Sequence, residues 1–144
     1  MYATVLVPLD GSHLAAAALP HAVVMAKQFG AKLLLLHVMT ETNGPLPDHS
    51  PERQALRSQL EAYLEGLKRS LDRCDVGSTY RVEVGAAAPT IARVAGELER
   101  TVIVMSRAGR TASLARQDKE SFGAVAEEVV REWEGPLLLV RPYA

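Results

Sequence analysis

The sequence predicts an α/β protein built on a parallel sheet with helices on both of its faces. Short apolar runs alternate along the chain with amphipathic stretches, and glycine or proline separates them. Strands that alternate with helices favour parallel pairing, because each helix carries the chain back across the sheet. The 144 residues, 48% hydrophobic and 23% charged, are typical of a single globular domain, which we expect to span residues 1–144.

Five runs are expected to form the strands. Continuous apolar runs ended by turn residues are typical of strands buried on both faces. An alternating run is typical of a strand with one exposed face, and one of the five is of this kind, Tyr80–Val84. The four continuous runs are Thr4–Leu9, Lys32–Val38, Thr101–Met105 and Leu137–Val140.

The first two helices are expected between these strands. The first runs from Leu14 to Gly30, and Pro20 lies inside it, so we expect a bend near 16–20. The second has Ser50 as N-cap and Pro51 at its first position, and leucines then recur every three or four residues. That spacing is typical of an amphipathic helix on the surface of a sheet.

Two further helices are expected in the third and fourth gaps between the strands. One starts near Pro89 and ends near Leu98. The last carries Val125, Val129 and Trp133 on one side and ends before the Gly-Pro pair at 135–136.

Composition excludes several function classes. The net charge of −1 gives no basic patch for nucleic acid or an anionic membrane, so neither is an expected partner. No apolar run is long enough for a membrane span, and the N-terminus lacks the basic region of a signal peptide. We therefore expect a cytoplasmic protein. The single cysteine, Cys74, excludes an internal disulfide.

Ligands in such sheets bind beyond the carboxyl ends of the strands, where the strand order reverses. The candidate loops therefore follow Leu9, Val38 and Met105. The Asp10 carboxylate either accepts hydrogen bonds from a ribose hydroxyl or binds a metal ion, or it caps the turn before the first helix. His37, inside an expected buried strand, is interpreted as a hydrogen-bonded core residue.

The segment after Met105 is rich in small and cationic residues and leads into a helix start at Gly123. Its basic residues are Arg107, Arg110, Arg116 and Lys119. Helix amino termini favour phosphate, so this segment is either a phosphate-binding loop or a solvated surface loop.

Segments spread over the whole chain resemble, in order, the universal stress protein family. They are Val5–Ser12, Ala18–Pro20, Leu36–Val38, Val102–Met105, Gly123–Val129 and Pro136–Pro142. The resemblance implies a five-stranded sheet in the order 3-2-1-4-5, with the switch point between the strands that end at Leu9 and Met105. It also implies a homodimer formed through the last strand, Leu137, Leu138, Leu139 and Val140.

The ATP-binding branch of that family carries glycine, two residues, glycine, nine residues, then glycine followed by serine or threonine. Here Ser106 stands in place of the first glycine and Ala124 in place of the hydroxyl residue, while Gly109 and Gly123 match. Thirteen residues separate those two glycines, four more than in the pattern. A side chain at 106 hinders close approach of a phosphate, whereas the lost hydroxyl costs only about 1 kcal/mol.

The resemblance assigns an adenine nucleotide, ATP with Mg²⁺ or AMP, to the switch point. Asp10 matches the ribose position and Val38 the adenine position. The full set of expected binding residues is Pro8, Leu9, Asp10, Val38, Met105, Ser106, Gly109, Arg110, Gly123 and Ala124. Three functions stay open: a nucleotide-binding stress-response regulator, a dimeric interaction module without a ligand, and a slow ATPase.

Overall fold

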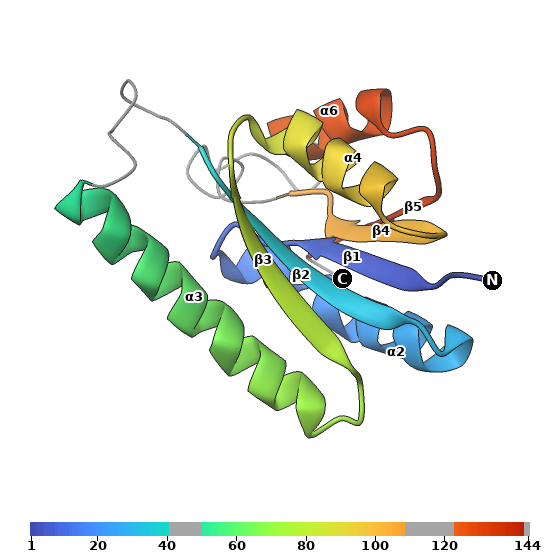
Figure 1. The fold of residues 1–144 in the computed structure, drawn as a ribbon. Helices are drawn as coiled ribbons and strands as arrows, with labels where there is room; N and C mark the ends of the chain where they lie inside the picture. Colours follow the sequence, from blue (N-terminus) through green and yellow to red (C-terminus); the bar gives the residue numbers. More distant parts are fainter. Residues whose placement is uncertain (41–49, 109–122, 143–144) are drawn as a thin grey trace.

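Five parallel strands form one sheet in the order β3-β2-β1-β4-β5 in the computed structural model of the chain (Figure 1). The structure describes residues 1–40, 50–108 and 123–142. The strands are β1 Thr4–Pro8, β2 Lys32–Met39, β3 Ser78–Val84, β4 Thr101–Ser106 and β5 Leu137–Val140. The fold class, the five strands and the strand order expected from the sequence are confirmed.

Helices cover both faces of the sheet (Figure 1). They are α1 His13–Ala16, α2 Leu19–Phe29, α3 Pro51–Asp72, α4 Ala87–Glu97 and α6 Ala124–Glu132. α1, α2 and α3 pack on one face, and α4 and α6 pack on the other. Successive side chains of β1 alternate between the two faces: Val5 and Val7 join the first core, and Leu6 joins the second.

The first expected helix is two helices, which corrects the prediction of one bent helix. α1 ends at Ala16, and α2 begins at Leu19 with Pro20 in its first turn. Proline is tolerated there because the first amides of a helix have no partner within the helix. Pro20 therefore starts a helix instead of bending one. Gly30 ends α2 in the left-handed conformation at φ 62°, as expected.

The other helices differ from expectation only at their ends. Ser50 caps α3, and its hydroxyl accepts a hydrogen bond from the Arg53 amide at 3.2 Å. α4 begins at Ala87, ahead of Pro89. Trp133 does not continue α6 but caps it, and its indole N–H donates to the Pro136 carbonyl at 3.0 Å. Within the described ranges, no helix has both the length and the apolar character to cross a bilayer.

Candidate functional site

A pocket lies at the carboxyl ends of β1, β2 and β4, which is where the sheet reverses its strand order. Its volume is about 600 Å³, counting the solvent in its mouth. The starts of α4 and α6 close its sides. The lining residues are Pro8, Leu9, Asp10, Ala15, Leu36, Val38, Ala87, Ile91, Met105, Arg107, Ala108, Gly123, Ala124, Val125 and Ala126.

The turn after β1 holds Asp10 at the pocket. One Asp10 carboxylate oxygen, Oδ1, accepts hydrogen bonds from the Ser12 amide at 2.9 Å and from the Ser12 hydroxyl at 2.6 Å. The same hydroxyl accepts from the Ala15 amide at 3.2 Å and so caps α1. Gly11 between them adopts φ +88°, which favours glycine. The structure therefore supports the turn-capping interpretation of Asp10 and also places this residue in the pocket lining.

The end of β4 is tied to its surroundings by backbone hydrogen bonds. The Arg107 amide donates to the Val140 carbonyl of β5 at 3.0 Å. The Arg107 carbonyl accepts from the Gly123 amide at 2.6 Å, next to the start of α6. These two contacts fix the position of residue 107 between β4, β5 and α6.

Ser106 closes a local turn and does not line the pocket. The Ser106 side chain is 5% exposed. Its hydroxyl donates to the Ala108 carbonyl at 2.6 Å and accepts from the Ala108 amide at 3.3 Å. The serine that replaces the family's glycine therefore binds the backbone two residues ahead of it.

Arg107 brings a positive charge to the pocket. Its side chain is only 9% exposed although it carries a guanidinium group. Sequence reasoning counted it among the cations of the loop but did not include it in the expected binding set. The signal that could have found it is its place directly after a strand at the switch point.

The walls between the two charged residues are apolar. β2 contributes Leu36 and Val38, α4 contributes Ala87 and Ile91, and β4 contributes Met105. Leu36, Ile91 and Met105 are each at most 5% exposed. Apolar walls with a few polar groups are typical of sites for small organic ligands.

Two titratable side chains interact with the turn after β1, namely His37 on β2 and Tyr63 on α3. The ring Nδ1 of His37 is 2.8 Å from the Leu9 carbonyl, which can only accept, so Nδ1–H is the donor. His37 thus joins the ends of β1 and β2. Burial, and then the negative charge of Asp10, raises the pKa of the Tyr63 phenol on α3.

Seven of the ten expected binding residues line the pocket together: Pro8, Leu9, Asp10, Val38, Met105, Gly123 and Ala124. Gly109 and Arg110 lie outside the described residues. The lining residues of α4 were missed, because nothing in the sequence shows which helix approaches the switch point. Among the side chains that the structure describes, no group of three or more His, Cys, Asp or Glu could hold a metal ion.

The fold and this pocket define a doubly wound α/β protein with a ligand-type cavity at its switch point. A family model described as the universal stress protein family matches residues 1–141. The chain belongs to the universal stress protein family.

Similar proteins match nearly the whole of this chain. The chain is 26% identical over 145 aligned positions to universal stress protein MJ0531 of Methanocaldococcus jannaschii, covering 98% of this chain and 83% of that protein. It is similar in structure to universal stress protein UspA of Lactobacillus plantarum, with a TM-score of 0.82, 20% identity, and 97% and 98% of the two chains covered.

Two further similar structures were solved with nucleotides. One is a universal stress protein in complex with cAMP, with a TM-score of 0.69, 21% identity and 98% of each chain covered. The other is the universal stress protein from Archaeoglobus fulgidus in complex with dAMP, with a TM-score of 0.65, 15% identity, and 96% and 97% covered. At these identities the likeness shows a shared fold.

Proposed function

We propose that this universal stress protein is a regulator that binds an adenine nucleotide in the pocket at the switch point. The observation that carries the proposal is the arrangement of charge in that pocket. Two charged residues line the pocket: Asp10 follows β1 and Arg107 follows β4, and most of the other lining residues are apolar. A nucleotide carries groups that match these residues: an apolar base, ribose hydroxyls that donate hydrogen bonds, and an anionic phosphate.

The apolar walls suit the base. Val38, Ile91 and Met105 come from three different elements and line one pocket. An adenine ring removes apolar surface from water when it enters such a slot, which favours binding by about 25 cal/mol per Å².

Asp10 suits the ribose. A carboxylate carries about four acceptor sites, a number that suits ribose hydroxyls as well as the Ser12 contacts of Oδ1. The hydrogen bonds from Ser12 fix the Asp10 side chain in place before a ligand binds.

Arg107 and the start of α6 suit the phosphate. Gly123 and Ala124, at the amino end of this nine-residue helix, line the pocket beside Arg107. Helix amino termini attract anions, and a guanidinium binds phosphate through two parallel hydrogen bonds. We infer that this arginine compensates for the incomplete glycine motif. The complexes of similar proteins with cAMP and dAMP support an adenine ligand.

Calorimetric titration tests the proposal with three ligands: ATP with Mg²⁺, ATP alone, and AMP. We expect saturable binding by the wild type. Arg107→Met should weaken it by about 10- to 100-fold, because hydrogen bonds to charged groups contribute about 1.5–3 kcal/mol. Arg107→Lys should retain part of it.

Arg131→Met is the matched control, because Arg131 is a 69% exposed arginine on the outside of α6. Equal affinity of the wild type and Arg107→Met would contradict the phosphate assignment. No binding of any of the three ligands to the wild type would overturn the proposed function. Phosphate release in the same samples would reveal a slow ATPase, and we expect Asp10→Ala to abolish it.

An interaction module without a ligand is the second candidate. It is favoured by Ala108, a residue of the pocket lining whose amide already donates to the Ser106 hydroxyl. A wild type that binds no nucleotide yet forms a stable dimer would support this function.

We also propose a homodimer formed through β5. This strand is apolar throughout, lies at the edge of the sheet, and has Leu138 38% exposed. Val130 on α6, the helix that precedes β5 in the chain, is 48% exposed. An apolar edge strand is a template for pairing with another chain, and a second copy would cover it.

A further inference from the structure

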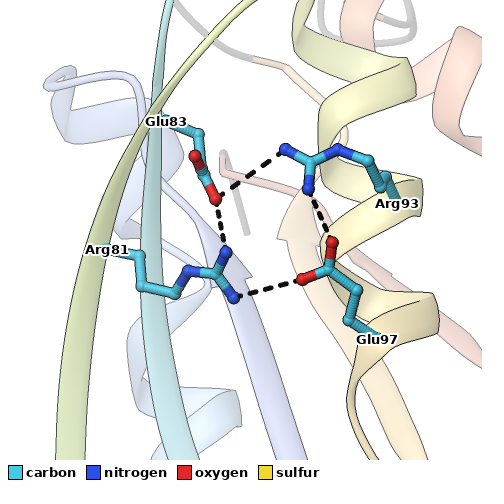
Figure 2. A network of polar contacts seen from close by, with 4 residues as sticks. All are labelled: Arg81, Glu83, Arg93 and Glu97. Carbon is cyan, nitrogen blue, oxygen red and sulfur yellow. Dashed lines mark hydrogen bonds and ion pairs between the residues drawn. The ribbon is translucent and has the colours of Figure 1, made fainter.

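Four alternating charges form a closed ring between β3 and α4 (Figure 2). Arg81 and Glu83 come from β3, and Arg93 and Glu97 come from α4. Arg93 donates to Glu97 at 2.6 Å and lies 3.7 Å from Glu83, while Arg81 lies 3.6 Å from Glu97 and donates to Glu83. Each charged group therefore contacts both opposite charges of the ring.

The ring joins α4 to a strand at the far edge of the sheet. α4 packs on β2, β4 and α6. β3 lies beyond β2, at the outer edge. Two of the four contacts, Arg81 with Glu97 and Arg93 with Glu83, cross between the helix and this edge strand. These two ion pairs therefore attach α4 to β3, in addition to the strands on which it packs.

The same helix forms one wall of the pocket. Ala87 and Ile91 line the cavity from the first two turns of α4, and Arg93 and Glu97 follow in its last two turns. An eleven-residue helix moves as one rigid body, so a shift of its ring end displaces its pocket end. α4 also packs against α6, whose first residues line the pocket as well.

We propose that the ring of Arg81, Glu83, Arg93 and Glu97 is a positioning device for the nucleotide pocket. By fixing α4 against the sheet, it sets the distance of Ile91 from the base-binding walls on β2 and β4. This inference rests on the proposed function. It means that four residues outside the pocket contribute to the affinity for the nucleotide.

The side chains are 24% to 52% exposed, so water and salt weaken each single pair. The expected effect of opening the ring is therefore moderate. We expect an increase of about threefold to tenfold in the dissociation constant for ATP, the sum of two weak cross-element contacts.

A charge reversal tests this without changing composition. The double variant Arg93→Glu with Glu97→Arg keeps the ion pair within α4 but sets like charges against Arg81 and Glu83. Adding Arg81→Glu and Glu83→Arg restores an alternating ring of opposite sign. We expect calorimetric titration with ATP to show weaker binding by the double variant and near wild-type binding by the quadruple variant.

The matched control is Arg57→Glu with Glu61→Arg, a reversal of an i,i+4 pair on α3. It should leave the affinity unchanged. Thermal unfolding of each free variant separates the two roles, because a purely structural ring would lower the melting temperature without changing the affinity of the folded protein. Arg93→Gln, which removes two contacts without repulsion, provides the same test if the double variant does not fold.

Affinities within twofold for the wild type, the double variant and Arg93→Gln would overturn the positioning role while leaving the proposed function intact. A weakened quadruple variant would also overturn it, since the restored ring should restore affinity. A wild type that binds no ATP would overturn the proposed function and this inference with it.

Discussion

The two edges of the sheet are built in opposite ways. β3 has seven residues, carries Arg81 and Glu83 on one face, and packs α3 against the other. β5 has four residues, all leucine or valine, and only one of them, Val140, is buried. One edge is therefore protected by charge and by a long helix, and the other presents apolar side chains.

This difference shows how one sheet directs its own association. Edge strands pair readily with other chains, and charged side chains are a common protection against such pairing. β3 has that protection. β5 lacks it along the described chain, so we expect the partner copy at β5 and not at β3. The predictions below test what secures each edge, from the largest expected effect to the smallest.

Packing of α3 should contribute most to holding β3. Leu64, in the middle of α3, is completely buried in the core beneath this side of the sheet. Leu64→Ala should lower the free energy of unfolding by about 2–5 kcal/mol, because it removes buried methyl groups and leaves a cavity. Urea denaturation measures the change.

Leu56→Ala on the same helix is the control, since Leu56 is 48% exposed. It should change the free energy by less than about 0.5 kcal/mol. Equal losses for the two variants would mean that α3 is not anchored through Leu64.

At the other edge, Leu138→Lys should separate the proposed dimer. Each dimer would have to bury two unpaired ammonium groups, so we expect the dissociation constant to rise by about 100-fold, or about 2.7 kcal/mol. Sedimentation velocity over a range of concentrations measures it. Val24→Lys, on α2 and 66% exposed, should leave the dimer intact. A monomeric wild type at micromolar concentration would contradict the dimer itself.

The charges on β3 should contribute less than its packing. Arg81→Ala removes two ion pairs of partly exposed groups, so we expect a loss of at most about 1 kcal/mol in the free energy of unfolding. The loss should shrink in 1 M salt, where the screening length is about 3 Å. Arg69→Ala, on a 74% exposed arginine of α3, should have no measurable effect. A loss that is independent of salt would assign the effect to packing by the arginine stem.

The smallest effect is expected from Tyr80 on β3. Burial, and then its hydrogen bond to Glu65, raises the pKa of this phenol above 10.0. The stability associated with the protonated phenol is therefore complete below about pH 10 and is lost as the pH rises through the folded-state pKa. Tyr80→Phe should flatten, without abolishing, the fall in stability above pH 10, because Tyr63 is shifted in the same direction. Identical slopes for wild type and variant would contradict this.

Much of the fold could be read from local patterns. Apolar runs such as Thr101–Met105 and caps such as Ser50 depend only on neighbouring residues, so the strands and most helix boundaries were predictable. The break before α2 was not, because the helical spacing of apolar residues from Leu14 to Ala26 continues across it. Proline is compatible with either a bend or a new helix, and packing of α2 on the sheet decided between them.

The residues of the pocket were likewise predictable in part. By its own pattern the sequence determined the strand ends, and the rule that ligands bind beyond carboxyl ends then led to Asp10, Val38 and Met105. Only the tertiary structure decided that Ile91 of α4 would face them, that Arg107 would be buried in the lining, and that Ser106 would turn away to bond Ala108. Periodicity records which side of an element is apolar, whereas the partner that covers that side is chosen by contacts between residues far apart in the chain.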